Sequence, residues 1–360
     1  MKILHVVGAR PNFMKIAPIM KAMSSNHDFF SQVLVHTGQH YDEAMSDIFF
    51  KEFELSAPDV NLEVGSGSHA WQTAQVLLRF EPVVSEYQPD WVITVGDVNS
   101  TLGCTLVCSK LGFPVAHIEA GLRSFDRNMP EEINRLLTDQ IAELLFTPSQ
   151  DANENLANEG IPAKKIHFVG NVMIDTLVHL LPKAKLKWPR LKDRFKLDRY
   201  LLVTLHRPSN VDNHQSLQNI LEALEEVSKS TAVIFPIHPR TRQRIEEFGL
   251  NKLIKGVQLL EPVGYLDFLA LQLHARLVLT DSGGVQEETT YLGIPCITAR
   301  PNTERPITLT LGTNHLVDNT RQELVEKIYA IMEKGSPNAQ VPPLWDGKTA
   351  ERIVGVFQNL

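Results

Sequence analysis

Short apolar segments that end in polar residues and lead into helical patterns recur along most of this chain. In the first half they cover residues 2–7, 32–37, 91–95, 114–118, 144–147 and 166–169. In the second half they cover residues 200–205, 232–237, 276–280 and 294–299. Short apolar runs that alternate with helical patterns are typical of parallel strands buried on both faces. The alternation therefore predicts an α/β protein with two Rossmann-like, doubly wound sheets.

The length of the chain sets the expected number of domains. At 360 residues it exceeds the size at which one hydrophobic core normally stops growing. Between the two halves, Pro182 and Pro189 interrupt a segment, residues 183–199, with eight basic and two acidic side chains. We expect the helix that precedes this segment to end near Leu181. The expected parts are an N-terminal domain (1–170), an interdomain helix and linker (171–199), a C-terminal domain (200–335) and a connector with a terminal helix (336–360).

Charge, hydropathy and cysteine content limit the partners that this chain is expected to have. The net charge of −7 argues against a nucleic-acid partner, which would favour a basic surface. No apolar run approaches the ~20 residues of a membrane-spanning helix, so we expect a cytoplasmic protein with no membrane partner. Cys104 and Cys108 lie four residues apart in an apolar helical pattern, which is typical of buried thiols. We expect no metal.

Two carboxylates stand where neighbouring strands end. Asp97 follows the apolar segment 91–95 and Gly96, and Glu119 follows the segment 114–118 directly. Ligands of open α/β sheets bind at the carboxyl ends of strands, so we expect Asp97 and Glu119 side by side in a cleft. There, like charges would favour a protonated carboxyl beside an ionised one, a donor next to a base. For Asp97 alone, capping of the following helix is an equally good interpretation.

A second group of charges lies between Glu119 and the helix that Pro130 begins. Glu131 follows Pro130, and acidic residues in the first turn also stabilise a helix N-terminus. Arg123 and Arg127 lie between the two glutamates in sequence. We favour the interpretation that these four side chains fold back on one another to perform acid/base chemistry on an anionic substrate.

Glycine turns before helices indicate anion binding in both halves. In the first half, Arg10 and Lys15 lie near the start of the helix that follows Gly8. In the second half, the turn 282–284 has the sequence Ser-Gly-Gly, so its backbone amides are open to a diphosphate. Glu288, just over one turn further along that helix, is suited to ribose hydroxyls. A plain turn followed by an acidic helical turn is the alternative.

Seven motifs identify the chain as similar to a known family. They are GARPNFMK (8–15), GDVNST (96–101), HIEAGLRS (117–124), PEEINR (130–135), LHRPSN (205–210), DSGGVQEE (281–288) and TERP (303–306). With these motifs in this order, the chain resembles the non-hydrolysing UDP-N-acetylglucosamine 2-epimerases. The resemblance implies a GT-B type fold, in which two Rossmann-like domains face one another across a cleft that holds the active site. It also implies no cofactor, a homodimer and a role in polysaccharide biosynthesis.

The resemblance further implies a reaction and a role for each motif residue. UDP leaves C1 of the sugar as C2 loses its proton, which gives UDP and 2-acetamidoglucal, and both then return with the proton on the opposite face. The implied catalytic residues are Asp97, Glu119, Glu131 and His206. The implied substrate-binding residues are Arg10, Lys15, Phe268 beside uracil, Ser282, Gly283, Gly284, Glu288 at the ribose and Arg305. The implied candidate effector site comprises Gln39, Arg207 and His238.

Several alternatives stay open at this point. Val263 replaces a glutamine that contacts uracil in some members of the family. A 2-epimerase of a UDP-2,3-diacetamido uronic acid would share the GQHYDEAM and EPVGYLDF segments. A hydrolysing epimerase would instead release free N-acetylmannosamine. From other classes, a GT-B glycosyltransferase or a nucleotide-sugar binding module without activity would share the fold, although the three carboxylates argue against the binding module.

Overall fold

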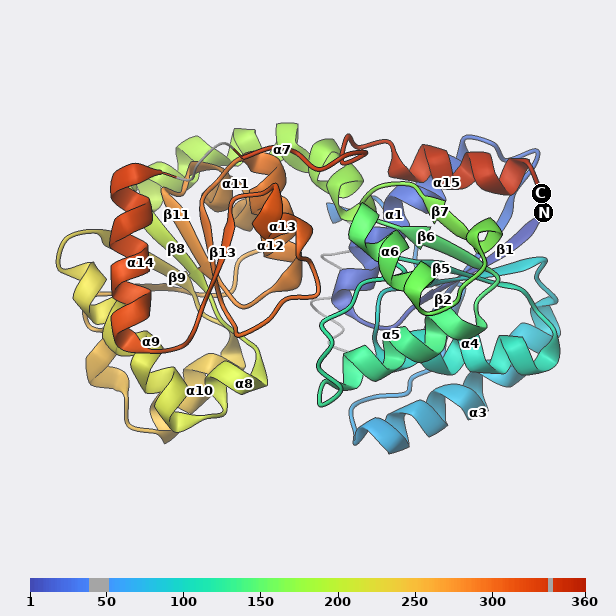
Figure 1. Ribbon diagram of the computed structural model, residues 1–360, viewed down its shortest axis with the longest axis horizontal. Helices are drawn as coiled ribbons and strands as arrows, with labels where there is room; N and C mark the ends of the chain where they lie inside the picture. Colours follow the sequence, from blue (N-terminus) through green and yellow to red (C-terminus); the bar gives the residue numbers. More distant parts are fainter. Residues whose placement is uncertain (39–51, 336–338) are drawn as a thin grey trace. The chain divides into compact units, whose positions relative to one another are not determined.

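In this computed structural model the described residues are 1–38, 52–335 and 339–360, with the backbone alone for Arg10. The chain forms two compact units (Figure 1). Unit 1 comprises Met1–Thr176 and Pro343–Leu360, and unit 2 comprises Leu177–Pro342. Each unit contains one parallel sheet with helices between its strands, which confirms the predicted fold class of two doubly wound α/β halves.

Unit 1 is built on a seven-stranded sheet in the order β3-β2-β1-β4-β5-β6-β7. Its strands are β1 (Lys2–Val7), β2 (Ser31–His36), β3 (Val60–Asn61), β4 (Trp91–Val95), β5 (Val115–Ile118), β6 (Leu144–Thr147) and β7 (Ile166–Phe168). The order changes direction between β1 and β4. In such sheets the carboxyl ends at this switch point form the usual ligand site, and Gly8, Gly96 and Glu119 follow the three strands nearest to it.

Helices cover both faces of the unit 1 sheet (Figure 1). One layer holds α3 (His69–Tyr87), α4 (Asn99–Leu111) and α5 (Pro130–Ile141). The opposite layer includes α1 (Arg10–Ser24), α6 (Gln150–Asn158) and the C-terminal α15 (Thr349–Gln358), with the short η1 (Ala163–Lys165) before β7. The C-terminal segment is fixed to this unit because Phe357 is fully buried and Trp345 donates from Nε1 to the Pro148 carbonyl at 2.8 Å.

Unit 2 repeats this design on a six-stranded sheet in the order β10-β9-β8-β11-β12-β13. The strands are β8 (Tyr200–Thr204), β9 (Ala232–Pro236), β10 (Gln258–Leu260), β11 (Leu277–Thr280), β12 (Cys296–Ala299) and β13 (Asn314–Val317). The helical elements are α8 (Pro208–Val211), α9 (His214–Ser228), α10 (Pro239–Glu247), η2 (Asn251–Ile254), α11 (Tyr265–His274), α12 (Gly283–Leu292), α13 (Ile307–Thr310) and α14 (Arg321–Lys334). The switch point lies between β8 and β11, which His206 and Asp281 follow.

The helix between the units differs from the sequence expectation. We expected it to end near Leu181, but α7 (Val172–Phe195) continues through Pro182 and Pro189. A proline inside a helix removes one backbone hydrogen bond, at a cost of roughly 3 kcal/mol. Buried side chains on one face of α7, among them Ala184 and Leu191, outweigh that cost. The exposed opposite face carries most of the basic residues that made this segment resemble a linker.

Candidate active site

Glu119 stands at the carboxyl end of β5 in an uncommon backbone conformation. Its φ is 71°, in the left-handed region that non-glycine residues seldom adopt. The backbone N–H groups of Glu119 and Ala120 both donate to the Phe146 carbonyl, at 3.1 and 3.0 Å, which fixes this turn. The Glu119 carboxylate accepts a hydrogen bond from Lys15, and both side chains are more than nine-tenths buried. The buried ion pair with Lys15 keeps this carboxylate away from solvent, and its catalytic role stays a prediction.

Asn12 and Gly96 explain how Lys15 reaches Glu119 from helix α1. The Asn12 side chain accepts from the N–H groups of Gly8 and Ala9 at 3.1 and 2.9 Å, and it donates to the Val95 carbonyl at 3.0 Å. It thereby joins the start of α1 to the end of β4, one turn before Lys15. A Cβ atom on Gly96 would lie only 3.3 Å from Lys15 Nζ and 3.4 Å from Glu119 Oε2. With a φ of 69° as well, this position favours glycine.

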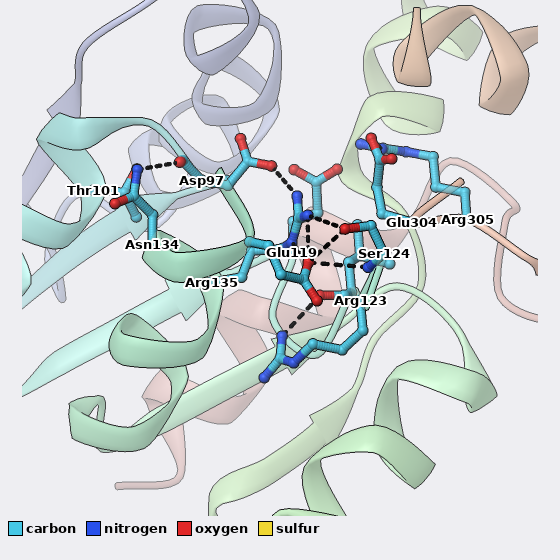
Figure 2. A network of polar contacts seen from close by, with 12 residues as sticks. Asp97, Thr101, Glu119, Arg123, Ser124, Asn134, Arg135, Glu304 and Arg305 are labelled. Carbon is cyan, nitrogen blue, oxygen red and sulfur yellow. Dashed lines mark hydrogen bonds and ion pairs between the residues drawn. The ribbon is translucent and has the colours of Figure 1, made fainter. Parts of the chain in front are cut away.

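Asp97 lies beside Glu119 because β4 and β5 pair in parallel with Val95 opposite Ile118. Its side chain is 31% exposed, and Oδ2 accepts from Arg135 at 2.5 Å (Figure 2). The Asp97 carbonyl accepts from the Asn134 side chain at 2.9 Å. The N-cap residue of α4 is Val98, which forms no side-chain cap, and a capping role for Asp97 stays an alternative prediction. The predicted neighbouring carboxylates are therefore present, and each is matched by a cation.

Arg123 does not have the position that we predicted. Its guanidinium is 1% exposed and is held by Asp139 at 2.7 Å and by both oxygens of Glu159 at 2.7 Å. These bonds occupy it in the packing of the turn after Glu119, so the prediction that Arg123 faces an anionic substrate is wrong. Arg127 is exposed on the loop before α5. The arginine that reaches a strand-end carboxylate is Arg135, which sequence reasoning missed.

The two glutamates that begin α5 have different surroundings. Glu132 is buried and accepts hydrogen bonds from the N–H and hydroxyl of Ser124, from the Phe125 N–H and from Arg135. Glu131 is partly exposed, and within the described part of the chain no hydrogen bond or ion pair involves its carboxylate. Its catalytic role remains a prediction.

In unit 2, the Ser-Gly-Gly turn opens α12 as expected. Ser282 is the N-cap residue, and its side chain does not cap the helix. Its backbone N–H donates to Thr280 Oγ1 at 3.0 Å. The Ser282 side chain therefore leaves the amides of the first turn of α12 uncapped. A helix N-terminus with open amides favours an anion such as a phosphate group.

Arg305 lies directly over this turn. A Cβ atom on Gly283 would lie 2.4 Å from Arg305 Nη1, so only glycine leaves room for the guanidinium. The buried carboxylates of Glu287 and Glu304 accept from Arg305 at 2.7 and 2.5 Å. Glu304 also accepts from Arg207 at 3.4 Å. Arg207, which we assigned to the candidate effector site, is therefore joined through Glu304 to the cation beside the glycine turn.

Asp281 orients His206 at the switch point of unit 2. The Asp281 carboxylate is fully buried and lies 3.1 Å from His206 Nδ1. It also accepts from the backbone N–H groups of His206 and Arg207 at 3.0 and 2.9 Å. Burial alone would raise the pKa of Asp281, but the hydrogen bonds from His206 and Arg207 outweigh burial and lower it. The His206 side chain is 43% exposed.

Glu288 is buried in α12 next to α11. Its Oε1 accepts from the Tyr265 hydroxyl at 2.8 Å. Burial raises the pKa of Glu288 to about 7. The neighbouring charge of Glu287 also raises this pKa, whereas the hydrogen bond from Tyr265 lowers it. Phe268 lies one turn after Tyr265 on α11 and is partly buried. The two residues predicted at ribose and uracil are thus brought to adjacent helices.

This raised pKa predicts a stability change in Glu288→Gln. Between pH ~4.5 and about 7 the folded protein keeps a proton that the unfolded chain releases, so Glu288 lowers stability as the pH rises through this interval. Removing the charge should stabilise unit 2 above about pH 7, by up to about 3 kcal/mol, and should change little near pH 4.5. Thermal unfolding at both pH values measures this, with exposed Glu246→Gln as the matched control. Equal effects of Glu288→Gln at the two pH values would contradict it.

Three further residues are predicted for the substrate site or the candidate effector site. Gln39 and the Arg10 side chain are outside the described residues, and His238 is an exposed cap of α10 whose ring centroid lies 6.1 Å from that of His206.

Cys104, Cys108 and Cys296 are buried free thiols. Among the described residues no three His, Cys, Asp or Glu side chains are grouped to hold a metal ion. In the same part of the chain, no helix is long and apolar enough to cross a membrane.

Comparison with known proteins decides the family. The family model described as UDP-N-acetylglucosamine 2-epimerase matches residues 22–358. The chain belongs to the UDP-N-acetylglucosamine 2-epimerase family. The family resemblance predicted from the seven motifs is thereby confirmed.

Relatives in this family match over nearly the full chain. A UDP-N-acetylglucosamine 2-epimerase of Methanocaldococcus jannaschii is 45% identical over 367 residues, covering 99% of each chain. A crystal structure of the M. jannaschii UDP-GlcNAc 2-epimerase in complex with UDP-GlcNAc and UDP gives a TM-score of 0.93 at 44% identity and covers 100% of both chains. A UDP-2,3-diacetamido-2,3-dideoxy-D-glucuronate 2-epimerase of Pseudomonas aeruginosa is 45% identical over 329 residues, 91% of each chain. The GT-B type fold that the motifs implied is confirmed by this structural likeness.

Proposed function

We propose that this member of the UDP-N-acetylglucosamine 2-epimerase family interconverts UDP-N-acetylglucosamine and UDP-N-acetylmannosamine. The observation that carries the proposal is Glu119, a buried carboxylate with a φ of 71° at a strand end, paired with Lys15. Uncommon backbone conformations and switch-point positions both occur at catalytic groups. The 45% identity to an enzyme with this activity supports UDP-N-acetylglucosamine as the substrate.

The two units supply different chemistry in this proposal. One carboxylate of unit 1 takes the C2 proton while the C1–O bond breaks, and the C2–H electron pair becomes the C1–C2 double bond of 2-acetamidoglucal. UDP leaves with the C1–O electron pair. In the return step a UDP oxygen attacks C1, and another carboxylate delivers a proton to the opposite face of C2. Asp97, Glu119 and Glu131 are the proposed carboxylates.

Unit 2 provides the groups that suit the departing UDP. The C2 proton is not next to a carbonyl, so its removal depends on how well the leaving diphosphate is stabilised. The amides at the start of α12, Arg305 and the partly exposed His206 side chain are the groups proposed for this role. Glu288 and Phe268 are proposed to contact ribose and uracil. Electrostatic stabilisation of this kind usually gives the largest single contribution to catalysis.

Incubation of the protein with UDP-N-acetylglucosamine in deuterium oxide tests this function. We expect UDP-N-acetylmannosamine as the product, with deuterium at C2, because the proton exchanges with solvent while it is held by a carboxylate. Free N-acetylmannosamine and UDP would indicate a hydrolysing epimerase. A sugar product without deuterium at C2 would indicate a transferase.

A 2-epimerase of a UDP-2,3-diacetamido uronic acid is the second candidate, because the P. aeruginosa relative with that name is equally identical at 45%. Its substrate differs from UDP-N-acetylglucosamine by a second acetamido group and a carboxylate. Turnover of that uronic acid, with none of UDP-N-acetylglucosamine, would replace the first proposal by this one.

We also propose that the chain forms a homodimer through the α3 and α5 face of unit 1. Large apolar side chains on this face are unusually exposed: Trp71 at 45% and Leu78 at 66% on α3, Ile133 at 37% and Leu137 at 48% on α5. Exposed apolar groups that gather on one face commonly mark protein interfaces. Sedimentation of the wild type and of Leu78→Glu tests this, since a dimer that the substitution does not weaken would exclude this face.

A further inference from the structure

Arg135 is a buried cation that touches a proposed catalytic carboxylate. Its side chain is 2% exposed, and Nη1 donates to Asp97 Oδ2 at 2.5 Å. On its other side, Nε and Nη2 donate to Glu132 Oε2 at 2.9 and 2.5 Å. Figure 2 shows the guanidinium joined to the Asp97 carboxylate. Arg135 lies on α5 and Asp97 follows β4, so the pair joins two elements of unit 1.

Glu132 fixes the guanidinium on the side away from Asp97. It accepts from the Ser124 N–H at 3.0 Å and from the Phe125 N–H at 2.9 Å, so it ties Arg135 to the loop after β5. Burial opposes ionisation of Glu132, but the bonds from Ser124 and Arg135 outweigh burial and lower its pKa. An ionised Glu132 with several fixed donors has little freedom to move. Arg135 therefore approaches Asp97 from a rigid support.

Among the described residues, charged side chains from three elements lie around Asp97. Helix α1 contributes Lys15, the end of β5 contributes Glu119, and α5 contributes Arg135 with Glu132. Lys15 is paired with Glu119, and Arg135 bridges Glu132 and Asp97. Without Arg135, Asp97 would lose its ion pair with that cation. It would then lie near the carboxylates of Glu119 and Glu132. Like charges then favour the protonated form of Asp97.

We propose that Arg135 is a positioning residue for the reaction, which acts through Asp97 by keeping this carboxylate ionised and aimed from α5. This inference rests on the proposed function, because it assigns Arg135 to the same proton transfer. Loss of Arg135 should lower kcat more than it raises KM, since the substrate-binding groups of unit 2 do not change. Loss of the cation should also move the acidic limb of the rate profile to higher pH.

Arg135→Gln and Arg135→Lys test this with UDP-N-acetylglucosamine as the substrate. For Arg135→Gln we expect kcat to fall by ~10² and the acidic limb of kcat to move upward by about one pH unit. Arg135→Lys retains a cation and should move the acidic limb of kcat back toward its wild-type pH. The planar arrangement of guanidinium N–H donors is lost in this variant. A limb that stays in place in folded Arg135→Gln would show a structural role alone and overturn the proposal.

Arg123→Lys is the matched control. Arg123 is equally buried and also bridges two carboxylates in unit 1, but these are Asp139 and Glu159. Its substitution should lower the unfolding temperature without moving the acidic limb. A limb that moves equally in Arg123→Lys would show that general loosening of unit 1 causes the effect, and would also overturn the proposal.

A double variant keeps the test decisive if Arg135→Gln fails to fold. In an Asp97→Asn background, Arg135→Lys should cause no further loss of kcat, because Arg135 acts through the missing carboxylate. Additive losses would contradict the proposal. Failure of the proposed function is distinguishable, since the wild type itself would then place no solvent deuterium at C2 of UDP-N-acetylglucosamine.

Discussion

Replacing Glu119 by glutamine is expected to lower turnover of UDP-N-acetylglucosamine by ~10² or more, because a positioned acid or base contributes about that factor. Asp97→Asn and Glu131→Gln should have effects of similar size if all three carboxylates transfer protons. Glutamine has nearly the shape of Glu119 and can still accept a hydrogen bond from Lys15. The substitution therefore removes the proton-transfer group and leaves the packing of the turn largely unchanged. Steady-state rates with UDP-N-acetylglucosamine measure the effect.

Stability has to be measured with activity for this variant. Lys15 and Glu119 form a buried pair, and removal of one charge from such a pair can cost about 3–5 kcal/mol of folding free energy. Asp97 is 31% exposed, so Asp97→Asn carries a smaller risk of unfolding and decides the question if Glu119→Gln is unstable. Glu143→Gln is a suitable control, since Glu143 lies in unit 1, is 54% exposed and pairs with Lys165 at 3.0 Å. Near-normal turnover in all three carboxylate variants would exclude the assignment.

The fold could be predicted wherever strands are buried on both faces. The central strands β1, β4 and β11 consist mostly of apolar residues, and their predicted bounds agree with the structure within one residue. Strands β3, β10 and β13 were missed. Each lies at an edge of its sheet and has two to four residues, some of them polar, so no run of buried side chains marks it in the sequence.

The candidate site could be predicted as far as backbone topology determines it. Asp97 and Glu119 follow adjacent parallel strands, so their proximity follows from the order of the sheet. Their cations could not be predicted in the same way. Arg123 is near Glu119 in sequence, but the turn directs its side chain toward Asp139 and Glu159. Arg135 reaches Asp97 only because α5 packs beside α4, a tertiary contact that no local pattern reports.

The two switch points show a common arrangement of charge. At each of them a polar or charged side chain that follows a strand is oriented by an ion pair or a hydrogen bond. In unit 1, Lys15 pairs with Glu119, and in unit 2, Asp281 holds Nδ1 of His206 at 3.1 Å. In each case the partner comes from a different element of the same unit. Such pairs limit side-chain motion before a substrate binds, which reduces the reorganisation that the reaction requires.

Gly283→Ala is expected to weaken the binding of UDP by ~10-fold to 10²-fold, since one charge-assisted hydrogen bond contributes about 1.5–3 kcal/mol. The added methyl carbon would lie 2.4 Å from Arg305 Nη1 and 3.0 Å from Glu304 Oε1. The guanidinium has to move, and the buried bonds to Glu287 and Glu304 oppose that movement. Arg305 would then no longer lie over the open amides of α12, where we propose that the diphosphate binds. Calorimetric titration with UDP measures the change directly.

Gly355→Ala separates this effect from a general effect of alanine in a helix. Gly355 lies in α15 with open space around its Cα, so a methyl group there meets nothing within 4 Å. This control should bind UDP as the wild type does and should be slightly more stable, because alanine favours helices over glycine by about 1 kcal/mol. Combining Gly283→Ala with Arg305→Gln should weaken UDP binding no more than Arg305→Gln alone, because both changes remove the same contact. Unchanged UDP affinity in Gly283→Ala would contradict the role of Arg305, and fully additive losses would show that the methyl group acts on the α12 amides instead.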